Sequence, residues 1–186
     1  TRSGLDETTT CTVDGGPVAA IAEDATLFVI DSRDFRSCTL TLQAFPDGNL
    51  EALSAFTQFT SVSESYNPSL GQLTLAGPAP VDQFEAVIRT VTYDNLSDDP
   101  DASQRIIDVV CTDDQAGSDS AMVTVNVVPV NVAPEVDLNG PGVGADFSTS
   151  FTEEGAPTNI GDPATLTTLD VDSTDLSICQ AVLMGG

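Results

Sequence analysis

The sequence contains no lysine, no histidine and no tryptophan, and each absence excludes a class of function. Without histidine, the chain cannot build a His-dependent catalytic triad or a His-ligated metal site from its own residues. Without lysine, it can form neither a Schiff base nor a phosphate-binding P-loop. Paired carboxylates would suit a glycosidase, but aromatic residues make up only 5% of the chain and no tryptophan is present to stack on a sugar. We therefore expect no enzymatic activity.

Positive charge is also scarce, because 29 acidic residues stand against 5 basic ones, all of them arginine, for a net charge of −24. Such a chain is repelled by the phosphates of nucleic acids and by anionic membrane surfaces. No apolar run approaches the roughly 20 residues that a membrane-spanning helix needs. We expect no nucleic-acid partner and no membrane insertion within this segment. The charge favours solubility and cation binding, although many carboxylates could simply form a solvated surface suited to salty water.

Four cysteines are present, Cys11, Cys38, Cys111 and Cys179, and none of them is spaced as CxxC. This disfavours a zinc or redox motif. An acidic chain that is rich in turns and strands and has an even number of cysteines is typical of extracellular or cell-surface proteins. We therefore expect that localisation.

Residues 151–183 are a near-copy of residues 11–42. Three pairs of residues match at spacings of 140, 139 and 141 residues: Gly15 and Gly155, Asp31 and Asp170, Cys38 and Cys179. A repeat of this length is too long for a solenoid unit and about right for a small domain. We divide the chain into a complete repeat, residues 1–132, and the N-terminal part of a second, incomplete repeat, residues 133–186.

The first residue of the chain corresponds to Pro141 of the second copy, which suggests a segment of something longer. The second copy stops after its third expected strand, and three strands leave open edges. Either the sequence is truncated there, or another chain supplies the missing strands by strand addition.

Short apolar and β-branched runs separated by Gly, Pro, Asn and Asp predict an all-β chain. Residues 37–44 alternate most clearly, with Cys38, Leu40 and Leu42 on one face. Residues 82–88 are the one helical candidate, with Asp82 as N-cap. The expected strands span residues 11–13, 25–30, 37–44, 56–66, 71–76, 91–93, 105–112 and 121–130. About seven strands per repeat with almost no helix favour a Greek-key β-sandwich.

Five pieces of the sequence carry a family resemblance. They are VIRTVTYDNLSDDP (87–100), VVCTDDQAG (109–117), VNVAPEVDLNG (130–140), FTEEGAP (151–157) and LDVDS (169–173). The chain resembles cadherin-like repeats of giant surface adhesins, and more loosely the chondroitin-sulfate-proteoglycan-type repeats. The resemblance implies a cadherin- or immunoglobulin-like Greek-key sandwich, calcium at the junctions between repeats, and a role in adhesion or surface scaffolding. The implied partners are neighbouring repeats of the same polypeptide or other copies of the chain.

The resemblance also implies the calcium ligands, since calcium takes six to eight oxygen atoms from carboxylates, carbonyls and amides. They would come from an acid on the first strand of each copy, from the linker and from a DxD turn: Asp14, Glu153, Glu154, Asn131, Asp170 and Asp172. Asp94, Asp98 or Asp99 could add oxygens at the same end, and Asp113 could serve the other end of the first copy. The alternative is that these acids only form surface turns, where Asp is common.

Two residues depart from the family pattern. Val132 stands where the linker of relatives carries an aspartate, which removes one ligand. Arg33 stands where the DxD turn of the first copy should have an acid, and its guanidinium could neutralise Asp31 or Asp113 without metal. We expect the site of the first copy to be weak or absent, and the site at the junction of the copies to be the better one.

In a Greek-key sandwich, the strand that starts at Cys38 and the strand that ends at Cys111 are antiparallel neighbours, so we predict a Cys38–Cys111 disulfide. Cys179 is the counterpart of Cys38, and its partner would lie beyond residue 186. Cys11 replaces Phe151 at a core position, which predicts a buried free thiol, although an interchain bridge through Cys11 or Cys179 is an alternative. Asn95 starts the sole glycosylation sequon, in a loop that we expect to be exposed and acidic.

These expectations describe a non-catalytic extracellular structural or adhesion module, a rigid spacer in a tandem-repeat surface protein with calcium at the junction between repeats. The alternative is a structural subunit of an extracellular filament or sheath, such as a flagellar hair or appendage. Such a subunit would assemble by strand or disulfide exchange between chains.

Overall fold

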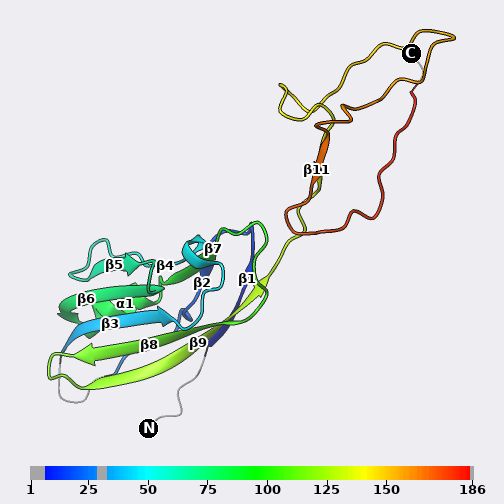
Figure 1. The fold of residues 1–186 in the computed structure, drawn as a ribbon. Coiled ribbons are helices and arrows are strands. Elements are labelled where there is room, and N and C mark those ends of the chain that lie inside the picture. The colour runs from blue at the N-terminus through cyan, green and yellow to red at the C-terminus, as the bar shows by residue number, and fades with distance from the viewer. Residues whose placement is uncertain (1–6, 29–32, 185–186) are drawn as a thin grey trace. The chain divides into compact units, whose positions relative to one another are not determined.

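The computed structural model describes residues 7–28 and 33–184, which belong to two compact units, Thr1–Val130 and Asn131–Gly186 (Figure 1). In the described part, the first unit is built almost wholly of strands with one α-helix, and the second holds a short strand pair. The expectation of an all-β chain is confirmed at this level. No helix of the described residues is long and apolar enough to cross a membrane.

Six strands form the larger sheet of the first unit, in the order β1-β9-β8-β3-β6-β5 (Figure 1). β1 runs parallel to β9, and all other neighbours are antiparallel. The strands are β1 (Glu7–Thr12), β3 (Asp34–Leu42), β5 (Ser63–Asn67), β6 (Gln72–Pro80), β8 (Arg105–Asp113) and β9 (Ser118–Val128). β3 therefore lies between two strands that follow it in the sequence, and the sheet joins distant parts of the chain.

Three shorter strands form the second sheet of this unit, in the order β2-β7-β4. They are β2 (Val18–Ala19), β4 (Glu51–Ser54) and β7 (Thr92–Asn95), and a single 3₁₀ turn, η1 (Gly48–Leu50), leads into β4. Both pairings are antiparallel. The sequence patterns did not predict β2 or β4, because two to four residues are too few to show a period.

One helix, α1 (Val81–Ile88), follows β6 and buries Phe84, Val87 and Ile88 as expected. Its start differs from the prediction, since Pro80 occupies the N-cap position and Asp82 lies in the first turn. A proline just before the helix suits its start, because the first N–H groups have no intrahelical partner.

Both sheets and the helix of the first unit share one core. The alternation of β3 places Cys38, Leu40 and Leu42 in it, as the sequence predicts. Leu53 comes from the second sheet, and the ring of Phe84 on α1 lies 5.6 Å from that of Phe35. Burial of these apolar side chains is the main driving force for folding of this unit.

Two predicted strands do not form where expected. Residues 25–28 are irregular, and the rest of that prediction, residues 29–30, lies outside the described part of the chain. Of residues 56–66, only the end belongs to β5. The backbone groups of both segments bind side chains of α1 and the turn after it instead of a sheet neighbour. The bonds run from Leu27 N to Glu85 Oε1 (2.9 Å), from Arg89 Nε to Ala25 O (2.7 Å), from Phe56 N to Thr90 Oγ1 (2.8 Å) and from Ser61 N to Gln83 Oε1 (2.7 Å).

The second unit has little regular structure. β10 (Glu135–Asp137) pairs with β11 (Thr167–Leu169) in antiparallel register, and no strand forms among residues 170–184. Most side chains of this unit are exposed, including those of Phe151 and Ile160. The third strand expected here from the repeat is therefore absent from the described residues.

Candidate functional site

Asp170 and Asp172 form a carboxylate pair just after β11 in the second unit. The backbone N–H of Val132 donates to Asp172 Oδ2 at 2.6 Å. The Oδ1 atoms of both aspartates are shielded from solvent and have no hydrogen-bond donor in the described structure. A proton on one carboxyl group that is donated to the other, or a bound cation, would satisfy these oxygens, because unpaired shielded charges are costly.

The two carboxyl groups have opposite pKa shifts. A hydrogen bond with Asp172, together with partial burial and the charge of that neighbour, raises the pKa of Asp170. The N–H of Val132 and the hydrogen bond from Asp170 lower the pKa of Asp172. The pair therefore holds one proton more readily than an isolated aspartate would.

Asn131 and Asp170 line the same open cleft of about 310 Å³, together with Ser173 and Asp175. Asn131 is exposed, and its Nδ2 donates to Val132 O at 3.1 Å. Three of the predicted calcium ligands, Asn131, Asp170 and Asp172, are therefore neighbours within the second unit. The described residues contain no group of three or more His, Cys, Asp or Glu side chains that could hold a metal ion.

The other predicted ligands are exposed turn residues. Asp14 follows β1, and Glu153 and Glu154 lie in the second unit, where neither lines the cleft. Asp14 and Glu154 both have a positive φ, 66° and 62°. Of the turn in the first copy, Arg33 is exposed and Asp31 lies outside the described residues.

The turns that hold Asp14 and Glu154 have the same hydrogen bond. Gly15 N–H donates to Thr12 O at 3.0 Å, and Gly155 N–H donates to Thr152 O at 2.9 Å. A Cβ atom on either glycine would lie 2.8 Å from the accepting carbonyl oxygen, so only glycine fits. The two copies thus share local structure as well as sequence at this turn.

The acids considered for the first unit have local partners. Asp113 Oδ1 accepts the backbone N–H of Gln115 (2.9 Å) and of Gly117 (2.8 Å), which closes the β8–β9 hairpin. Asp94 accepts the N–H of Asn95 at 3.1 Å, and Asp98 and Asp99 are exposed. Asp113 therefore stabilises a turn, which agrees with the alternative that these acids form turns and do not bind calcium.

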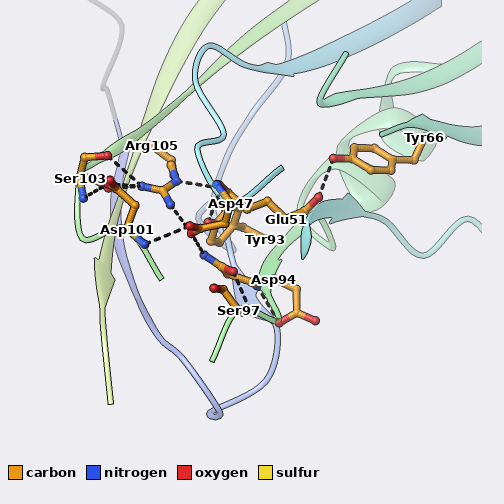
Figure 2. Close-up of polar contacts among 10 residues, drawn as sticks. Asp47, Glu51, Tyr66, Tyr93, Asp94, Ser97, Asp101, Ser103 and Arg105 are labelled. Carbon is orange, nitrogen blue, oxygen red and sulfur yellow. Dashed lines mark hydrogen bonds and ion pairs between the residues drawn. The ribbon is translucent and has the colours of Figure 1, made fainter. Parts of the chain in front are cut away.

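Sequence reasoning missed a buried ionic cluster in the first unit, centred on Arg105 (Figure 2). Its side chain is fully buried and forms two ion pairs of 2.8 Å, from Nε to Glu51 Oε2 and from Nη2 to Asp47 Oδ2. Arg105 lies on β8 of the larger sheet, Glu51 on β4 of the smaller one, and Asp47 just before η1. The cluster therefore links the two sheets across the core.

Neutral side chains complete this cluster. The Tyr93 hydroxyl donates to Glu51 Oε2 at 2.6 Å (Figure 2). Asn95 Nδ2 donates to Asp47 Oδ2 at 2.7 Å. Burial, followed by the hydrogen bond and charge of Glu51, raises the pKa of Tyr93 far above its usual value. Burial opposes the charge of Arg105, but Glu51 and its other neighbours outweigh this and raise its pKa. Every charged group is paired, so the cluster is suited to holding the fold and not to exchanging protons.

One signal for this cluster was present in the sequence. Arg105 starts the run RIIDVVC, in which alternate residues face the core, and it occupies the buried set with Ile107 and Val109. An arginine at an inward position needs a buried acid, but the sequence does not say which of the 29 acidic residues supplies it.

The expectation that Asn95 lies in an exposed loop is wrong. Asn95 is the last residue of β7 and is 2% exposed, and its Nδ2 is bonded to Asp47. Ser97 of the same sequon is also buried. A glycan on Nδ2 would break the cluster around Arg105, so the folded unit does not offer this nitrogen for glycosylation.

The structure contains the Cys38–Cys111 disulfide, and the two cysteines are directly opposite in the β3–β8 ladder. Cys11 is a free, buried thiol, and Cys179 is free and exposed. Burial, followed by the charge of Asp94, raises the pKa of Cys11, which makes it a poor nucleophile.

Comparison with known proteins gives one relative at low coverage. An alignment 104 positions long, which covers 53% of this chain, is 36% identical to halomucin of Haloquadratum walsbyi (strain DSM 16790 / HBSQ001). The chain spans about 1% of the length of that protein. No protein-family model matches the chain, and no solved structure matches it.

Proposed function

We propose that this chain is a non-catalytic structural or adhesion module, a rigid spacer of an extracellular tandem-repeat surface protein. The shared turn of the two copies, from Thr12 to Gly15 and from Thr152 to Gly155, is the observation that carries the proposal. A likeness to about 1% of halomucin fits a module of a much longer chain. The Cys38–Cys111 disulfide fits an oxidising, extracellular location.

For the first unit, we infer a cadherin- or immunoglobulin-like Greek-key sandwich of about seven strands per repeat. Support comes from two sheets that bury one common core and from β3, which lies between the later strands β6 and β8. The ion pairs of Arg105 and the disulfide both join separate strands, so they stiffen the unit, as a spacer requires.

We infer that calcium binds at Asp170 and Asp172, with Asn131 and the cleft beside it. The support is the pair of shielded Oδ1 atoms that have no donor, since a divalent cation would satisfy both at once. The pKa of Asp170 is raised by its neighbour, so a proton and a cation would compete for this carboxyl group.

Calorimetric titration of calcium into the metal-free chain tests the metal site. We expect saturable binding that is abolished in the double variant Asp170→Asn, Asp172→Asn. Glu23→Gln, Asp24→Asn is the matched control, because it removes the same charge from exposed positions of the first unit. All titrations need the same ionic strength, since a chain of charge −24 attracts cations non-specifically. Equal binding by the wild type and the Asp170, Asp172 variant would refute the metal site.

A second candidate function is a subunit of an extracellular filament or sheath. The observation that favours it is the apolar surface of the second unit, where Phe151 and Ile160 are 68% and 71% exposed. Such surfaces tend to mark interaction sites. Light scattering over a wide range of chain concentrations distinguishes the two functions: a filament subunit grows in mass with concentration, and a spacer module stays monomeric.

A further inference from the structure

Residues 175–183 of the second unit repeat the pattern of β3. Aligned on Cys38 and Cys179, β3 reads DFRSCTLTL and residues 175–183 read DLSICQAVL. An aspartate, a large apolar residue, a cysteine and a leucine recur at the same four positions. On β3, three of these four, Phe35, Cys38 and Leu42, belong to the buried face.

The same positions have opposite environments in the two units. On β3, Phe35 is 4% and Leu42 is 2% exposed, whereas their counterparts Leu176 and Leu183 are 41% and 102% exposed. Residues 175–183 pair with no strand in the described part of the chain. A segment with the composition of a core strand therefore lies without a neighbour in the second unit.

The first unit shows what covers such a segment. β8 pairs with β3 along nearly its whole length, from Phe35 opposite Asp113 to Leu42 opposite Ile107. Within this register Cys38 lies opposite Cys111, and the two are joined. The register thus decides both which apolar residues meet and which cysteines meet.

We propose that residues 175–183 are the docking site for a strand of the β8 type, and that Cys179 forms a disulfide with a cysteine of that strand. The occupant has apolar residues at alternate positions and a cysteine at the place of Cys111 in Arg105–Asp113. The proposal rests on the tandem-repeat organisation proposed above. It extends the β3–β8 interface of the first unit to the second unit. Earlier in the second unit, the turn from Thr152 to Gly155 already has the same hydrogen bond as the turn from Thr12 to Gly15.

The chemistry of this step is thiol–disulfide exchange. The thiolate of Cys179 attacks a sulfur of the strand cysteine that is held in a mixed disulfide with a small thiol. A new S–S bond forms, and the small thiol leaves with the electron pair and takes up a proton. The oxidant is therefore a low-molecular-weight disulfide, as found in extracellular compartments. Cys179 is accessible for this attack, whereas Cys11 is buried and its thiol is held protonated.

Coupling of the full chain to a synthetic strand tests the proposal. The peptide has the sequence of residues 105–113, with its cysteine activated as a thiopyridyl disulfide, so that each coupling releases one coloured thiopyridone. The control peptide exchanges Val110 and Cys111, which keeps the composition but turns the thiol to the other face of the strand. We expect coupling of the first peptide to be about tenfold faster or more, because strand pairing raises the effective concentration of its sulfur at Cys179.

Three outcomes would overturn the proposal. The first is equal coupling rates for the two peptides, and the second is attachment at Cys11, located by mass spectrometry of the digested conjugate. The third is a chain that prefers to dimerise through Cys179 when the peptide is present in equal amount. Cys179→Ser should release no thiopyridone beyond the slow background of Cys11. The assay contains no calcium, so occupation of the metal site does not affect its result, and a calcium-binding chain that couples without selectivity refutes only this inference.

Discussion

Arg105 and Glu51 form an ion pair of 2.8 Å in which both side chains have zero solvent exposure. The pair joins a strand of the larger sheet to a strand of the smaller one, and Asp47 and Tyr93 complete its hydrogen bonds. Transfer of charges from water into a core costs several kcal/mol per ion, so the cluster is stable only while every member is present.

Replacement of Arg105 by Met should therefore destabilise the first unit strongly. The variant leaves Glu51 and Asp47 buried without a counter-charge, which costs about 3–5 kcal/mol. Urea unfolding followed by circular dichroism measures the loss. Arg36→Met is the matched control, because Arg36 is exposed and its replacement should change stability by less than about 0.5 kcal/mol. Similar effects of the two substitutions would contradict the structural role of the cluster.

The two tyrosines that bind Glu51 allow a finer comparison. Tyr93→Phe removes a buried hydrogen bond of 2.6 Å to the carboxylate, and Tyr66→Phe removes one of 3.0 Å to the backbone carbonyl. Hydrogen bonds to charged groups contribute about 1.5–3 kcal/mol and those between neutral groups about 0.5–1.5 kcal/mol. We expect Tyr93→Phe to lower the free energy of unfolding more than Tyr66→Phe. The reverse order in urea titrations would show that the bond to the carboxylate is not the stronger one.

Loss of the Cys38–Cys111 disulfide should also destabilise the first unit. The bond closes a segment with a sequence separation of 73 residues. Restricting the unfolded chain in this way contributes about 2–4 kcal/mol. The double variant Cys38→Ala, Cys111→Ala should unfold at lower urea concentration, and Cys179→Ala, at an exposed position, should not. An unchanged midpoint for the double variant would contradict this prediction.

The carboxyl pair of the second unit should show two separate titrations. Carbon-13 NMR of the carboxyl groups should place the midpoint of Asp170 above its ordinary value of 3.8 and that of Asp172 below it. Calcium should lower the Asp170 midpoint, because the cation competes with the proton. Asp162, whose pKa the N–H of Ala164 lowers, is the internal control and should not respond to calcium. Identical shifts at Asp162 and Asp170 would point to general screening.

The two aspartates affect stability with opposite sign. The raised pKa of Asp170 favours the folded state below its unfolded pKa, and this contribution is lost as pH rises through the folded value. The lowered pKa of Asp172 favours the folded state above its unfolded pKa, and this contribution is lost as pH falls through the folded value. The thermal stability of the second unit should therefore vary with pH on both sides of 3.8, and Asp170→Asn should remove the loss on the alkaline side.

Local pattern was a good guide where a segment is long enough to show its period. The alternation from Cys38 to Leu42 predicted β3, and the apolar face of Phe84, Val87 and Ile88 predicted α1. It failed for residues 25–28 and for the start of 56–66, which have the composition of strands. There the polar side chains of α1 and its following turn take the backbone hydrogen bonds that a sheet neighbour would otherwise supply.

For the candidate sites too, the sequence predicted some features correctly and missed others. The family resemblance predicted Asn131, Asp170 and Asp172 as ligands, and the structure brings them together: Asp172 accepts the N–H of Val132, and Asn131 and Asp170 line one cleft. The sequence did not show that Asn95 is buried, because its neighbours Asp47 and Arg105 are 48 and 10 positions away along the chain.

By itself, the sequence determined the all-β class, the acidic surface, the absence of histidine and lysine chemistry, and the likeness of the two copies. These are properties of composition and of short-range periodicity, which any folded form of the chain must respect. Only the tertiary structure decided that Arg105 pairs with Glu51 and Asp47, and that the two Oδ1 atoms of Asp170 and Asp172 are left without a donor. Hydrophobic periodicity shows which face of a strand is buried, but the partner it meets there depends on long-range pairing, which is set by the packing of the whole unit.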